Sequence, residues 1–141
     1  MKNFKITISL FSLVFFLQGC DPSSQRTFDL VPSDTYKPIQ SNTAFKSDLG
    51  SSMQIIKCLA TKEGFNEYNL PSEFDIKYYQ RHCKTGTQSI YISYIEDRDV
   101  IWITVIERPN LKFSQNSWDI CEELIKQFRI KFGNDRIKTI D

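Results

Sequence analysis

Apolar residues follow two different periodicities along the chain, and each periodicity predicts one kind of element. Between Phe45 and Ala60 they recur every three or four residues, which predicts a helix over residues 43–62. Gly50 is a candidate break in this helix, and Gly64 is placed to end it as a left-handed cap residue. A second helix is predicted over residues 117–132, where one face is apolar: Trp118, Cys121, Leu124, Ile125, Phe128 and Phe132.

Alternating apolar and polar positions predict strands between the two helices. The alternation covers residues 74–83, 89–95 and 100–107, and the polar residues 96–99 predict a hairpin turn between the last two. Residues 66–72 are read as a turn-rich link, and residues 136–140 as a short edge strand. The order α-β-β-β-α, with that final strand, predicts an α+β fold: an antiparallel sheet with helices on one face.

The pattern also divides the chain. A single small α+β domain is expected over residues 42–141, since neither periodicity persists before it. Residues 20–41 contain three prolines and many small polar residues, and they are read as a flexible tether of which Phe28, Leu30 and Val31 could dock on the domain. Residues 1–19 have a different character.

The N-terminus is positively charged and then apolar. Lys2 and Lys5 precede an apolar run over residues 6–17 that is too short to span a bilayer, which needs about 20 residues. This pattern is typical of a secretory signal peptide. It ends at Leu17-Gln18-Gly19-Cys20, which resembles the lipobox of bacterial lipoproteins, with Gln18 where a small residue is usual.

The resemblance implies cleavage before Cys20 and attachment of lipid to its sulfur. We therefore expect a lipoprotein of the cell envelope, anchored to a bilayer and facing the periplasm or the exterior. Asp21 resembles a signal for retention in the inner membrane. The alternatives are an uncleaved membrane helix, or an ordinary signal peptide with an incidental cysteine.

Charge and cysteine content narrow the expected partners. Removing residues 1–19 leaves sixteen basic against seventeen acidic residues, a net charge of −1, so nucleic acid is not an expected partner. In an oxidising compartment, Cys58, Cys83 and Cys121 predict one disulfide and one buried thiol. Cys58–Cys83 is the favoured pair, and Cys58–Cys121 is the alternative.

The most informative run of the domain is Val100–Ile106, because both of its faces are apolar. Ile101, Ile103 and Val105 are predicted to cover the helices. The opposite face then carries Val100, Trp102 and Ile106, with Tyr91 or Tyr94 of the neighbouring strand beside them. Either the tether or loops cover that face, or it is a patch that binds a partner.

Catalytic chemistry has no candidate residues in this pattern. His82 is adjacent to Cys83, and successive strand residues point to opposite faces, which disfavours a Cys–His pair. The cysteine and histidine spacings match no zinc pattern, and phosphate-loop and metalloprotease motifs are missing from the sequence. We therefore expect neither enzyme activity nor a metal or other cofactor.

The resulting hypothesis is a non-catalytic module that binds another envelope or secreted protein, in one version as an inhibitor or immunity-type protein. The alternative is a structural or assembly factor of an envelope complex.

Overall fold

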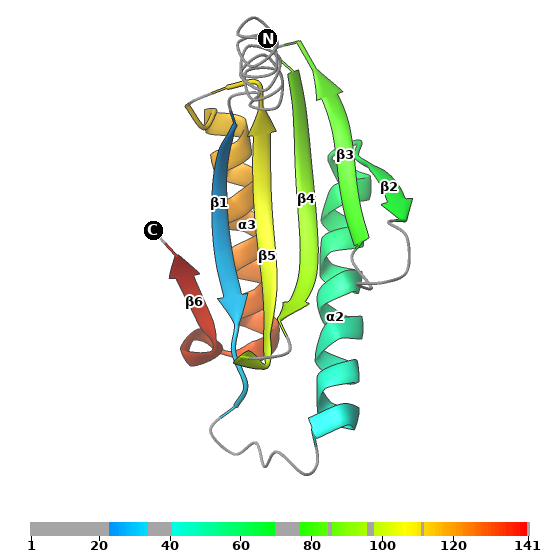
Figure 1. Ribbon diagram of the computed structural model, residues 1–141, viewed down its shortest axis with the longest axis vertical. Helices are drawn as coiled ribbons and strands as arrows, with labels where there is room; N and C mark the ends of the chain where they lie inside the picture. The colour runs from blue at the N-terminus through cyan, green and yellow to red at the C-terminus, as the bar shows by residue number, and fades with distance from the viewer. Residues whose placement is uncertain are drawn as a thin grey trace, which may run out of the picture.

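A six-stranded antiparallel sheet with two helices on one of its faces forms the fold (Figure 1), which confirms the predicted α+β class. The computed structural model describes residues 23–33, 41–69, 77–84, 86–95, 98–110 and 112–140, and for residues 41–46 and 69 the backbone alone. The strands lie in the order β2-β3-β4-β5-β1-β6. Their bounds are β1 Ser24–Leu30, β2 Asn66–Asn69, β3 Lys77–Cys83, β4 Gly86–Ile95, β5 Val100–Arg108 and β6 Ile137–Ile140.

Strand β1 corrects the predicted tether. Ser24 pairs with Glu107 and Leu30 with Ile101, so β1 lies between β5 and β6 inside the sheet. Only Phe28 and Leu30 show the apolar alternation, which is too little to predict a strand. The strand forms because its backbone groups pair with the long apolar strand β5, and this partner is far away in the sequence. Residues 20–22 and 34–40 of the predicted tether, with the lipidation candidate Cys20, lie outside the described residues.

Other boundaries differ by smaller amounts. The predicted link at 66–72 is partly wrong, because residues Asn66–Asn69 form β2 and pair with β3. The β4–β5 hairpin is confirmed, and β6 is confirmed as a short strand at the sheet edge. The predicted strand at residues 74–83 corresponds to β3, and its first three positions, residues 74–76, lie outside the described residues.

Both predicted helices form. Helix α2, Ser41–Lys62, runs through Gly50 without a break. Gly64 follows it with φ +79°, in the left-handed region as expected. Helix α3, Gln115–Phe132, begins after Ser114, whose hydroxyl accepts a hydrogen bond from the Ser117 amide at 3.2 Å.

The core lies between the helices and one face of the sheet. Phe28 of β1 and Phe128 of α3 are both fully buried, and their rings meet edge to face at 5.1 Å. Ile101, Ile103 and Val105 face the helices as predicted. The other buried apolar side chains complete this layer: Leu30, Ile56, Leu59, Ala60, Phe65, Tyr79, Ile90, Ile92, Ile120, Cys121, Leu124, Ile125 and Ile137.

Four chain segments meet at one end of the sheet, which we call the Ser24 end. They are the start of β1, the end of β5, the turn from β3 to β4, and the start of α3 (Figure 1). The backbones approach closely there, since a Cβ on Gly86 would lie 1.9 Å from the Arg108 carbonyl oxygen. Only glycine fits at that position.

Candidate functional site on the open sheet face

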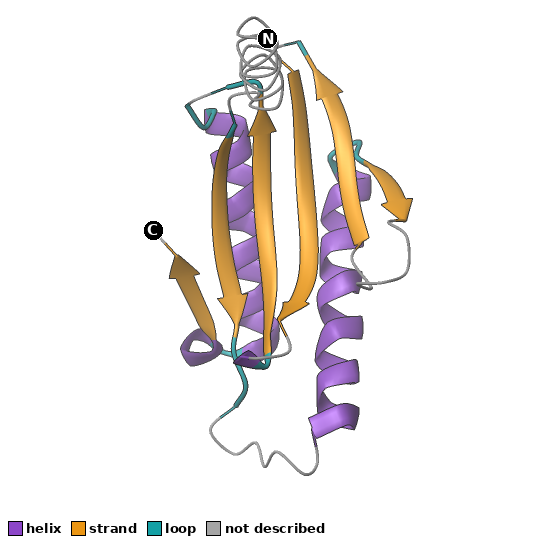
Figure 2. Cartoon of the chain, viewed as in Figure 1, coloured by secondary structure: helices purple, strands orange, loops and turns teal. Residues whose placement is uncertain are grey.

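Neither described helix covers the second face of the sheet, which we call the open face. Both helices lie behind the strands in Figure 2, and the open face is turned toward the viewer. The strand register brings residues of neighbouring strands into rows across this face. A partner bound to this face would contact these rows.

A row of tyrosines crosses the open face. Tyr68, Tyr78 and Tyr91 come from β2, β3 and β4, and their rings stack in sequence at 5.1 and 5.4 Å. Thr104 and Thr27 continue the row across β5 and β1, with their hydroxyl oxygens 3.0 Å apart. Tyr68 at the sheet edge is exposed, whereas Tyr78 and Tyr91 are half-buried. Stacked rings are rigid and amphipathic, which suits a protein-binding surface.

A second row contains two polar groups without partners. Asp29 lies directly opposite Trp102, and the Arg98 guanidinium stacks over the Trp102 ring at 5.1 Å. Asp29 Oδ1 and Trp102 Nε1 are both buried and find no hydrogen-bond partner among the described residues. Burial raises the pKa of Asp29, and the nearby charge of Arg98 opposes this shift. A buried acceptor and a buried donor, side by side and both unsatisfied, are costly unless something else bonds to them.

The predicted partner-binding residues divide between the two faces. Tyr91, Trp102 and Ile106 lie on the open face, where all three are half-buried. Val100 has the same orientation along β5 but is only 6% exposed. The prediction that Tyr94 belongs to the open face is wrong. Tyr94 pairs with Ile101 and packs against the core, and its hydroxyl donates a hydrogen bond to Asp99 Oδ1 at 2.7 Å. Its position directly opposite Ile101 fixes its side, since paired residues of neighbouring strands share a face.

A buried polar network at the Ser24 end was not predicted. Glu107 is 1% exposed, and its carboxylate accepts hydrogen bonds from Ser117 Oγ at 2.6 Å, the Ser114 amide at 3.0 Å and Asn110 Nδ2 at 2.8 Å. Burial raises the pKa of Glu107, but these hydrogen bonds outweigh it and leave the pKa lowered. The β5 alternation places position 107 on the helix side, and that signal was available in the sequence.

The network continues through Gln88. Its side-chain amide donates to Ser117 Oγ at 2.7 Å and to Asn116 Oδ1 at 3.1 Å, and its Oε1 accepts from Arg81 Nε at 2.6 Å. Arg81 also bonds to Asn116 and to the Glu63 carbonyl, so it ties β3 to the ends of both helices. Because these partners satisfy Glu107 and Gln88, we assign this network a structural role.

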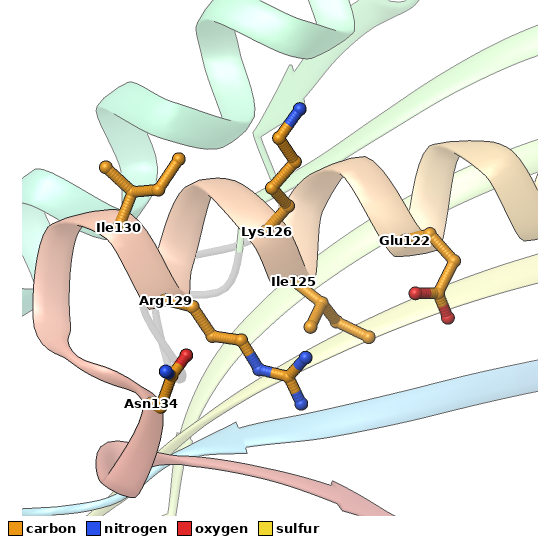
Figure 3. Close-up of a pocket in the computed structure, with 6 residues that line it drawn as sticks. All are labelled: Glu122, Ile125, Lys126, Arg129, Ile130 and Asn134. Carbon is orange, nitrogen blue, oxygen red and sulfur yellow. The ribbon is translucent and has the colours of Figure 1, made fainter.

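An open groove of about 510 Å³ lies along the outer surface of α3 (Figure 3). Figure 3 shows Glu122 and Arg129 on one side of the helix and Lys126 on the other, with Asn134 just after the helix. Ile130 is highly exposed beside them, at 71%. The groove is shallow and its charges are of both signs, so it lacks the converging titratable groups of an active site.

The three cysteines of the domain are free thiols. The favoured Cys58–Cys83 disulfide is not formed, and both of these thiols are exposed. The alternative with Cys121 is not formed either, because Cys121 is fully buried on the inner face of α3 while Cys58 is exposed on α2. Desolvation raises the pKa of Cys121 to about 11. His82 is an exposed residue near the end of β3, next to Cys83.

Within the described ranges, acidic, cysteine and histidine side chains form no group of three that could hold a metal ion. None of the described helices is both long and apolar enough to cross a bilayer. No protein-family model matches the chain, and no curated protein is significantly similar to it.

Proposed function

We propose that this protein is a lipoprotein of the cell envelope, anchored through Cys20, that binds another protein with the open face of its sheet. The observation that carries the binding role is the pairing of Asp29 and Trp102 beside the tyrosine row. A buried carboxylate oxygen and a buried indole N–H without partners among the described residues fit a ligand that donates and accepts hydrogen bonds. A peptide or side-chain amide has both groups.

The rigid aromatic row supports a protein as the ligand. Tyr and Trp are enriched at the centres of protein interfaces because they bury much area for little lost side-chain entropy. Three stacked tyrosines and Trp102 supply such anchors on one continuous face. An inhibitor or immunity-type role, in which the module covers the active surface of a toxin or enzyme, is the specific form that we favour.

Photocrosslinking from the two sides of the domain tests the binding role in intact cells. p-Benzoylphenylalanine replaces Tyr78 or Tyr91 on the open face and, as the matched control, Ile130 on the exposed surface of α3. We expect one protein adduct of the same mass from both tyrosine positions and none from position 130. The Trp102→Ala substitution should remove the adduct without removing the protein from the membrane fraction. Adducts that form equally from both sides, or from position 130 alone, would contradict the proposal.

The anchor has its own test. The mature protein should begin at Cys20 and carry acyl mass on that residue, and Cys20→Ser should release the protein from membranes. An intact chain that begins at Met1 and carries no acyl group would refute the anchor and leave the binding face untouched.

A further inference from the structure

The position of β1 leaves almost no spacer between the proposed anchor and the folded domain. Three residues, Asp21 to Ser23, separate Cys20 from the first residue of β1. Four Cα–Cα steps reach at most about 14 Å when the chain is fully extended. The headgroup layer on one side of a bilayer is roughly 5–7 Å thick. Because part of the reach of about 14 Å is used to cross the headgroup layer, the remaining chain spans at most about one Debye length. The Ser24 end is therefore held within that distance of the headgroups.

Most of the exposed charges at the Ser24 end are basic. Lys84 lies in the turn after β3, Arg108 ends β5, and Lys112 precedes α3, and all three side chains are exposed. Among the residues that the structure describes, the acidic ones near this end are the buried Glu107, Glu63, which lines a pocket with Lys84, and the exposed Asp119, which follows Trp118 in α3. The mature chain is close to neutral overall, so this distribution is local.

Aromatic side chains accompany these charges. Trp118, in the first turn of α3, is 44% exposed and meets the half-buried Phe113 edge to face at 6.3 Å. Arg26 of β1 lies over the Trp118 ring at 4.0 Å, which fixes the ring beside the start of that strand. Basic residues together with a tryptophan are the usual composition of a surface that lies against headgroups.

We infer that the Ser24 end is a membrane-docking surface for anionic headgroups, made by Lys84, Arg108 and Lys112 with Trp118. This inference rests on the proposed anchor and adds the orientation that the anchor leaves open. The strand axes then point away from the membrane plane. The open face lies along the side of the domain rather than against the bilayer, where a soluble partner can reach it. Each basic side chain near an anionic surface favours the docked orientation about fivefold, or ~1 kcal/mol.

The two tryptophans of the chain measure this orientation directly. Trp118 lies at the Ser24 end, whereas Trp102 pairs with Asp29, five residues farther along β1, or roughly 17 Å at ~3.4 Å per residue. The experiment uses the full lipidated protein in phosphatidylcholine vesicles that contain phosphatidylglycerol and brominated lipid, which quenches nearby indoles. Trp102→Phe leaves Trp118 as the reporter, and Trp118→Phe leaves Trp102.

We expect strong quenching of Trp118 and little of Trp102. The triple variant Lys84→Glu, Arg108→Glu, Lys112→Glu should shift the equilibrium more than a hundredfold away from the docked orientation. The quenching of the two tryptophans should then be similar. The matched control also reverses the charge of one arginine and two lysines, with Arg129→Glu, Lys131→Glu and Lys138→Glu. These three side chains are exposed and lie in or after the last turn of α3. The control should leave Trp118 quenched. Replacing phosphatidylglycerol by phosphatidylcholine should weaken the quenching of Trp118 in the unreversed protein.

The outcomes separate this inference from the anchor. Protein that floats with the vesicles while Trp118 and Trp102 are quenched equally would overturn the docking surface and keep the anchor. The same holds if both triple variants behave alike. Protein that lacks acyl mass and does not float would overturn the anchor and the inference together.

Discussion

Phe28 decides whether the residues after the proposed anchor are a tether or part of the fold. Its side chain is fully buried, it lies opposite Ile103 in the sheet, and its ring meets Phe128 at 5.1 Å. In a flexible tether, Phe28→Ala would change the free energy of unfolding by less than about 0.5 kcal/mol. In the observed strand it removes a buried ring and leaves a cavity between the sheet and α3.

The expected loss is about 3–5 kcal/mol, the usual cost of a buried Phe→Ala substitution. Since small domains are stable by about 5–15 kcal/mol, this is a large share of the total. Urea unfolding of residues 21–141, followed by circular dichroism, measures the loss. Ile130→Ala is the control because Ile130 is 71% exposed, and it should cost less than about 0.5 kcal/mol.

A milder variant protects the test if Phe28→Ala does not fold. Phe28→Leu keeps the position apolar and should lower the unfolding free energy by about 1–2 kcal/mol. If Phe28→Ala costs no more than Ile130→Ala, with the same dependence on urea, then β1 contributes nothing to stability. The short spacer, and with it the docking surface, would then be wrong.

Three further predictions concern buried titratable groups. Because the folded pKa of Glu107 is lowered, its charged form stabilises the fold above the unfolded pKa, and this stabilisation is lost as pH falls toward acid. Glu107→Gln should therefore lower the free energy of unfolding by ~2 kcal/mol at pH 7 and make that free energy depend less on pH in the acid range. Asp29 has a raised pKa, so its charge opposes folding at neutral pH. Asp29→Asn should therefore raise the midpoint of urea unfolding at pH 7, while it weakens the crosslinking from p-benzoylphenylalanine at position 91. A lower midpoint would contradict the unsatisfied burial of Asp29. Cys121, with its pKa raised to about 11, should resist a thiol reagent that modifies Cys58 and Cys83 in the folded protein, and it should react only on unfolding. Equally fast modification of all three thiols in the folded protein would refute the burial of Cys121.

The sequence by itself determined the elements whose pattern is local. The helical period of α2 and α3, the alternation in β4 and β5, and the hairpin between them are all encoded within single segments. So is the division of β5 into a helix side and an open side, which placed Trp102 and Ile106 together. The lipobox-like stretch around Cys20 is likewise a local signal, and the proposal of an anchor rests on it alone.

Only the tertiary structure decided what depends on distant partners. Strand β1 has too few apolar positions to be recognised, and it forms because β5, more than seventy residues away, supplies its ladder. The unsatisfied pair of Asp29 and Trp102 exists because the same strand is inserted there, and the short link from Cys20 to the Ser24 end has the same origin. Periodicity reports which side of an element is buried, whereas register between distant strands sets which side chains become neighbours, and the local pattern does not contain that register.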